Sequence, residues 1–234
     1  MFIAGFPAGP WGTNCYVVAT RPGSECVVVD PGKDAVDGVA DVVREQRLKP
    51  VSVLLTHGHI DHVWCVVPIA GSYSSPAWLH PADRHLLKDP LADISPDSAA
   101  LMVGSGYCFA EPDDLRTLED GQDLEIAGLT FAVDHAPGHT AGSVLFRSGY
   151  DGPEDVPEVV FAGDVLFAGS IGRTDLPGGD HAAMLRSLAD KVLPLDDRAV
   201  VLPGHGPQTS IGHERATNPY LVDLPSATGP KRGL

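Results

Sequence analysis

The pattern of apolar and polar residues along this chain predicts two kinds of segment, β-strands and amphipathic helices. The β-branched runs "NCYVVAT" and "ECVVVD" flank "RPGS", and this arrangement predicts a β-hairpin. In "DAVDGVADVVREQ" the apolar residues recur at helical intervals, so the segment predicts an amphipathic helix. Further strands are predicted for "VSVLL", "AWLH", "LTFAVDHA", "SVLFRS", "EVVFAG" and "RAVVLPG".

The remaining segments complete a fold of class α/β. We expect one helix in "HVWCVVPIA" that ends near Pro68, another that begins near Pro81, and a third in "DHAAMLRSLADKVL" with Asp180 as its N-cap. Residues 88–122 are rich in Pro and Asp, and we interpret them as a surface excursion suited to a lid. The strands come in blocks, which favours two sheets with helices on their outer faces in one domain, residues 1–217. Residues 218–234 form a partly loose tail.

Charge and composition narrow the range of partners. The net charge of −15 over 234 residues disfavours nucleic acid and anionic membrane surfaces, because both attract basic patches. No stretch reaches the roughly 18 apolar residues of a membrane span, and the N-terminus lacks the basic region of a signal peptide. The four cysteines form no C-x-x-C pair and are expected to be small buried residues. We therefore expect a cytoplasmic protein.

Metal-capable side chains gather where four predicted strands end. The strand ends are "VSVLL-THGHIDH", "LTFAVDHAPGH", "EVVFAGD" and "AVVLPGH". A single histidine beside a glycine is usually a loop residue, but three imidazoles and a carboxylate within six residues would repel one another as they protonate. Imidazole and carboxylate without thiolate suit zinc, iron or manganese. The candidate ligands are His57, His59, Asp61, His62, His139, Asp164 and His205.

Seven ligands are too many for one four-coordinate ion and fit two ions if one carboxylate bridges them. His57 and His59 point the same way in extended chain, because the side-chain period is two. We assign these two to the first ion with His139. We assign Asp61, His62 and His205 to the second ion, with Asp164 bridging the pair.

The motifs "THGHIDH", "PGHT", "FAGD" and "PGHG", in this order, resemble the metallo-β-lactamase superfamily. The loop "GSIGRTDLPGGD" is similar to one in the compact bacterial members of its glyoxalase II-like (hydroxyacylglutathione hydrolase-like) branch. The resemblance covers roughly residues 10–220. It implies an αβ/βα four-layer sandwich of two mixed sheets, with a dimetal site between the sheets. It also implies hydrolysis of a thioester of a small thiol, such as S-lactoylglutathione, by attack of a hydroxide that bridges the two ions.

The sequence departs from the family pattern at two places. Trp64 and Cys65 follow the histidine motif where the family often has glycines. Only 29 residues follow His205, too few for the C-terminal helical domain with which well-studied glyoxalase II enzymes hold glutathione. We therefore expect the hydrolytic centre without that mode of glutathione recognition, and the thiol stays open, as does the oligomeric state.

Other residues have candidate roles beside the ligand set. Asp61 is a candidate acceptor of the proton from the bridging water, and Asp30 in "VVDPG" either orients a ligating histidine or caps a turn. Arg173 in "GRTD" either binds a substrate carboxylate or locks its loop with Asp175. Phe167 either lines the pocket or packs in the core.

Two other functions fit parts of the same pattern. Persulfide dioxygenases also carry a GRTD loop and hold one iron through the counterparts of His57, His139 and Asp164. A metal-binding protein without catalysis is the second alternative, although a degenerate site usually loses one or more ligands. The number of bound ions separates the dioxygenase from the hydrolase.

Overall fold

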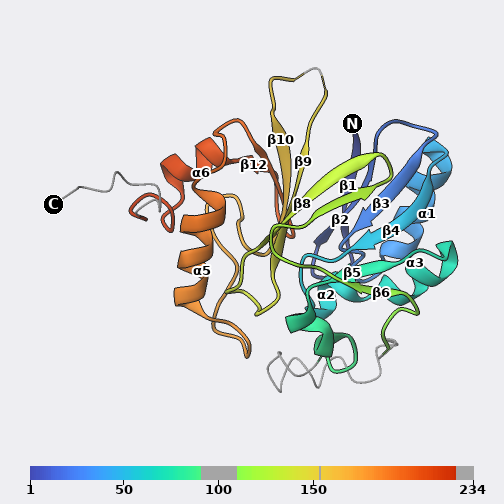
Figure 1. Cartoon of the computed structure of the whole chain (residues 1–234), viewed down its shortest axis with the longest axis horizontal. Helices are drawn as coiled ribbons and strands as arrows, with labels where there is room; N and C mark the ends of the chain where they lie inside the picture. Colours follow the sequence, from blue (N-terminus) through green and yellow to red (C-terminus); the bar gives the residue numbers. More distant parts are fainter. Residues whose placement is uncertain (91–109, 153, 225–234) are drawn as a thin grey trace.

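The computed structural model describes residues 1–90, 110–152 and 154–224, which form two mixed six-stranded sheets (Figure 1). The strand order of the first sheet is β1 (Phe2–Ala8), β2 (Thr13–Ala19), β3 (Glu25–Val29), β4 (Lys49–Leu54), β5 (Ala77–Leu79) and β6 (Leu115–Thr117). The strand order of the second sheet is β12 (Thr209–Ser210), β11 (Val200–Pro203), β10 (Glu158–Gly163), β9 (Val144–Gly149), β8 (Leu129–His135) and β7 (Asp123–Ile126). Parallel pairing runs from β3 to β6 and joins β10 to β11, whereas the other neighbours are antiparallel.

Helices cover the outer faces of both sheets, as Figure 1 shows. On the first sheet lie α1 (Ala35–Gln46), the short α2 (Ile60–Val63) and α3 (Val66–Tyr73), followed along the chain by the 3₁₀ helix η1 (Pro81–Leu87). On the second sheet lie α5 (His181–Ser187), the π-helical turn η2 (Leu188–Val192) and α6 (Ile211–Thr217). The order helix, sheet, sheet, helix is the four-layer sandwich expected from the resemblance.

Alternate residues of the central strands pack into different cores. In β2, Val17 packs in the cluster that includes α1 and α3, whereas Val18 packs in the cluster between the sheets. In β10, Val160 packs with α5 residues such as Met184, whereas Phe161 lies between the sheets. Because both faces are buried, these strands are nearly continuous apolar runs in the sequence.

Most predicted elements are present, including the β2–β3 hairpin and α1. Asp180 caps α5 as predicted, since its Oδ1 accepts a hydrogen bond of 2.9 Å from the Ala183 amide. The predicted end of a helix at Pro68 is wrong, because α3 begins at Val66 and Pro68 stands in its first turn. Proline is tolerated there, since the first amides of a helix have no partner within the helix.

The predicted excursion over residues 88–122 is wrong in one part, because residues 115–117 form the edge strand β6, parallel to β5. Three residues are too short for a periodicity to mark them. Residues 91–109, on which the lid prediction mainly falls, lie outside the described part of the chain. Leu221 is buried in the second core, so packing continues beyond residue 217. No helix within the described ranges combines the length and the apolar character that crossing a membrane requires.

Candidate metal centre

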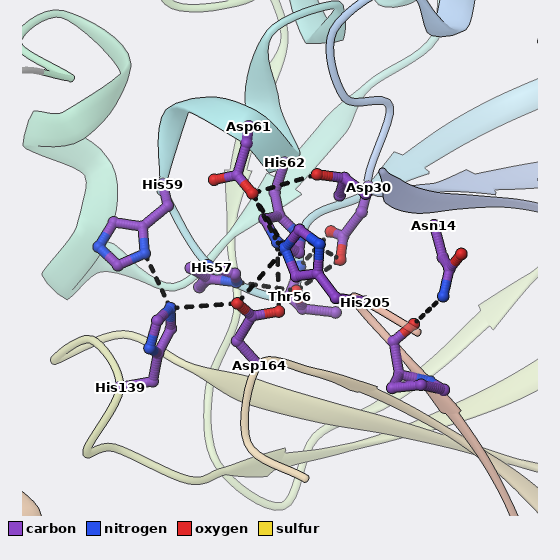
Figure 2. Close-up of polar contacts among 12 residues, drawn as sticks. Asn14, Asp30, Thr56, His57, His59, Asp61, His62, His139, Asp164 and His205 are labelled. Carbon is purple, nitrogen blue, oxygen red and sulfur yellow. Dashed lines mark hydrogen bonds and ion pairs between the residues drawn. The ribbon is translucent and has the colours of Figure 1, made fainter. Parts of the chain in front are cut away.

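Four loops at one end of the sandwich bring the seven predicted ligands together (Figure 2). The loop after β4 carries His57 and His59, and α2 begins at once and carries Asp61 and His62. His139 lies between β8 and β9, whereas Asp164 and His205 follow β10 and β11. Each loop leaves a rigid strand, and this is why residues up to 148 positions apart meet at one place.

The first ligand group consists of His57, His59 and His139, which are all buried. One ligand atom from each lies within 4.8 Å of the others, and His59 Nδ1 is 2.8 Å from His139 Nε2. His139 Nδ1 donates to the backbone carbonyl of Arg173 at 2.8 Å, which leaves its Nε2 with a lone pair toward the group. The buried Nε2 of His57 has no hydrogen-bond partner.

The second group consists of Asp61, His62 and His205. His205 Nε2 lies 3.0 Å from Asp61 Oδ2 and 3.3 Å from His62 Nε2. The opposite nitrogen of each ring faces an oxygen, because His62 Nδ1 is 3.0 Å from Asp30 Oδ2 and His205 Nδ1 is 3.2 Å from the Trp11 carbonyl. These oxygens fix the Nδ1–H tautomer of both rings and turn their Nε2 lone pairs toward the centre.

Asp164 lies between the two groups. Its Oδ1 is 3.3 Å from His62 Nε2, and its Oδ2 is 3.5 Å from His139 Nε2 and 3.6 Å from His205 Nε2. Its Oδ1 is also buried without a hydrogen-bond partner. Glycine is required beside it, because a Cβ at Gly204 would stand 2.2 Å from that oxygen. The sequence predicts a bridging role for Asp164, and the structure places its carboxylate between the two groups.

The electrostatics of the two groups differ. Burial, followed by the neighbouring imidazoles, lowers the pKa of His57, and burial with His139 lowers the pKa of His59 to about 3. Burial also opposes the charged form of His62, but Asp61 and Asp164 outweigh it and raise the pKa of that imidazole. His57 and His59 are therefore neutral and offer lone pairs, whereas the second group contains the carboxylate of Asp61.

The donor set fits metal ions. His62 Nε2 and His205 Nε2 face each other across 3.3 Å, and His205 Nε2 also faces Asp61 Oδ2 at 3.0 Å, so a proton or a cation must lie among these atoms. His57 Nε2 and Asp164 Oδ1 are acceptors that are buried without a donor, which is costly unless a cation occupies the site. The cluster is consistent with a site for two ions, and its nitrogen and oxygen ligands suit zinc, iron or manganese.

The other predicted residues lie around this cluster. Asp30 accepts from the Thr56 amide at 2.8 Å and from the Thr56 hydroxyl at 2.6 Å, in addition to facing His62. Phe167 packs edge-on against His205, with ring centroids 6.1 Å apart. The exposed guanidinium of Arg173 makes a double hydrogen bond to Asp175, so its side chain locks its own loop and only its carbonyl supports His139.

Several supporting residues carry no signal in the sequence. The buried Thr13 donates from its hydroxyl to Asp61 Oδ2 at 3.1 Å, and Trp11 supports His205 through its carbonyl. Asn14 donates to the carbonyls of Pro203 and Gly206, on either side of the His205 loop (Figure 2). All three belong to the β1–β2 connection or the start of β2, where only the paired sheets reveal their proximity to the centre.

Comparisons with known proteins agree with this geometry. The model of the metallo-beta-lactamase superfamily matches residues 8–205. An uncharacterized protein of Mycobacterium tuberculosis is 47% identical over 96% of this chain and 99% of its own length. The probable metallo-hydrolase YqgX of Bacillus subtilis is 34% identical (92% and 95% covered), and the hydroxyacylglutathione hydrolase GloC of Haemophilus influenzae is 32% identical (94% and 98% covered).

Solved structures extend the comparison to the fold. The BLEG-1 B3 metallo-beta-lactamase has a TM-score of 0.80 and 40% identity, covering 94% of this chain and 99% of its own. The di-iron-bound form of TTHA1623 has a TM-score of 0.74 and 38% identity, covering 94% and 100%. With the family model spanning the ligand loops, the chain belongs to the metallo-beta-lactamase superfamily.

Proposed function

We propose that the protein is a metal-dependent hydrolase that holds two divalent ions and cleaves a thioester of a low-molecular-weight thiol. The observation that carries the proposal is the inward set of acceptors: His57 Nε2 and Asp164 Oδ1 are buried without a partner, and the Nε2 atoms of His62 and His205 face each other across 3.3 Å. The names of two relatives, a probable metallo-hydrolase and a hydroxyacylglutathione hydrolase, support hydrolysis as the reaction. The di-iron form of a similar structure supports two ions.

Different residues of the chain would hold the two ions. His57, His59 and His139 would hold one ion, Asp61, His62 and His205 the other, and Asp164 both. When bound, two ions supply an activated hydroxide near neutral pH and polarise the carbonyl under attack. Although burial opposes ionisation, His62 and His205 lower the pKa of Asp61, so this carboxylate is ionised and can accept the proton of the water. The departing thiolate needs little acid assistance, because an ordinary thiol has a pKa of about 8.5.

The substrate would approach beside His205, the most exposed histidine of the centre. Its side chain is 28% exposed, against 0% for His62. Trp11, which is 38% exposed, contacts it through the backbone, and Phe167 contacts it through the ring. We infer that these two aromatic residues flank the entry and contact the part of the substrate that does not react.

The first experiment is the metal content per chain, measured by elemental mass spectrometry on protein purified without added metal or chelator. About two ions per chain, with release of free thiol from S-lactoylglutathione or another acyl thiol, would support the proposal. A single iron with no second ion taken up on addition of zinc would contradict it and favour persulfide oxidation. A chromogenic cephalosporin tested in parallel separates thioester from β-lactam hydrolysis.

Replacing Asp30 by asparagine is expected to weaken metal binding and kcat/KM by about 10–100-fold. The single oxygen of an asparagine amide cannot accept both from His62 Nδ1 and from the Thr56 backbone amide, which contact different oxygens of Asp30. Asp34→Asn is the matched control. Both aspartates have a left-handed backbone, with φ of 48° and 62°, but Asp34 is exposed. Equal losses in both variants, measured by thiol release and zinc titration, would show that Asp30 has no specific role in supporting the metal centre.

Phe167→Ala is expected to lower kcat/KM about tenfold, mainly through KM, since it removes about 1.4 kcal/mol of apolar contact beside His205. Arg173→Ala is expected to change kcat/KM less than about twofold, because the guanidinium already pairs with Asp175 at the surface. Steady-state kinetics on one thioester test both variants. A large rise in KM for Arg173→Ala would instead assign its side chain to a substrate carboxylate.

A further inference from the structure

One buried carboxylate outside the ligand set joins the two halves of the three-histidine group. Asp83 belongs to η1, is 1% exposed and stands in no motif of the sequence. Its Oδ2 accepts from the Gly58 amide at 2.9 Å and from the Thr140 hydroxyl at 2.7 Å. Its Oδ1 accepts from the Gly142 amide at 2.7 Å.

These contacts reach both loops that carry the group. Gly58 stands between His57 and His59 on the loop after β4 of the first sheet. Thr140 follows His139 on the loop between β8 and β9 of the second sheet. Asp83 therefore connects two loops from different sheets, and two of its contacts, Gly58 and Thr140, adjoin the three histidines in the sequence.

Two glycines leave the space that this carboxylate occupies. A Cβ at Gly58 would stand 2.9 Å from Asp83 Cβ, and a Cβ at Gly142 would stand 2.6 Å from Asp83 Oδ1. Any larger residue at either position would push the carboxylate away from its donors. Two of its three partners are backbone amides, which donate only, so an acceptor-only carboxylate suits the site and an amide side chain does not.

We propose that Asp83 is a positioning residue that sets the spacing of His57, His59 and His139 and thereby the affinity of this group for its ion. The inference rests on the proposed metal centre and deepens it. Asp83 would act through the loops, because its carboxylate accepts hydrogen bonds from Gly58, Thr140 and Gly142 rather than from the ring of a ligating histidine. The loops hold His59 Nδ1 and His139 Nε2 2.8 Å apart, close enough to share one ion. Loss of the carboxylate should weaken the binding of one of the two ions and leave the binding of the other unchanged.

The test is a titration of zinc alone into metal-free protein against a competing chromophoric chelator. Asp83→Asn is expected to bind one zinc ion about 10–100-fold more weakly than the parent and the other with unchanged affinity. Glu214→Gln is the matched control, since Glu214 is equally buried and accepts from the Gly169 amide and the Thr209 hydroxyl, neither of which lies on the two loops of the three-histidine group. It should lower the melting temperature without changing either zinc affinity.

Combining Asp83→Asn with a second substitution shows which ligand group its effect on zinc affinity depends on. In His59→Ala, where the three-histidine group is already broken, adding Asp83→Asn should change zinc affinity no further. In Asp61→Ala, where that group is intact, the full loss should persist. If Asp83→Asn does not fold, Thr140→Val and Thr140→Ser replace it, because valine removes the hydroxyl that donates to Asp83 and serine keeps it.

The outcomes separate the two proposals. Unchanged zinc affinities in Asp83→Asn, or an equal loss in Glu214→Gln, would overturn the role of Asp83 while leaving the metal centre intact. A parent protein that binds no zinc would instead overturn the proposed function on which the role depends.

Discussion

Replacing Asp164 by alanine is expected to lower kcat/KM by at least about 10³-fold, the equivalent of about 4 kcal/mol of transition-state stabilisation. Asp164 is the only described residue whose carboxylate lies within 3.6 Å of histidines from both groups. Without it, no described carboxylate would join the two proposed ions, and the centre would lose one of the negative charges that offset two cations. Thiol release and metal content, measured on the same sample, test the expectation.

Glu158→Gln controls for a general effect on the strand. Glu158 begins β10, the strand that Asp164 follows, and it pairs with Arg147 at the far end. Its loss should leave kcat/KM and metal content nearly unchanged. An Asp164→Ala variant that keeps two ions and more than a tenth of the activity would show that Asp164 does not bridge them.

Removal of the metal is expected to abolish activity and to lower the melting temperature by roughly 10 °C. An ion present at 1,000 times its dissociation constant stabilises the native state by about 4 kcal/mol, and each kcal/mol shifts the melting temperature of a domain of this size by about 2–4 °C. Chelation would leave the Nε2 atoms of His62 and His205 facing each other across 3.3 Å, with His57 Nε2 and Asp164 Oδ1 buried and without partners.

Calorimetry before and after chelation measures this effect, and zinc, manganese and iron(II) are then added back separately. The ion that restores both activity and melting temperature identifies the working metal. Asp164→Ala should show a smaller shift on chelation, because it binds less metal at the start. Identical melting temperatures with and without chelator would mean that the cluster is stable without ions and would contradict a metal centre.

The sequence alone determined which side chains were predicted to gather as ligands, because strand ends and glycines are local features. β-Branched runs mark the strands, and the histidines stand directly after them in "THGHIDH" and "PGH". The hairpin, α1 and the N-cap Asp180 depend on neighbours in the chain and were predicted for the same reason. Local rules failed where tertiary contacts decide: three-residue β6 is held by its pairing with β5, and α3 continues through Pro68.

Only the tertiary structure decided how the centre is supported. Trp11, Thr13 and Asp83 reach their partners across 194, 48 and up to 59 residues, and no period in the sequence relates them. It also places the Arg173 guanidinium against Asp175 and the Asp30 carboxylate against His62. A residue type and its neighbours determine which ligands a chain offers. The direction of each lone pair depends on the oxygen that packs behind the ring, and the packing of the two sheets places that oxygen.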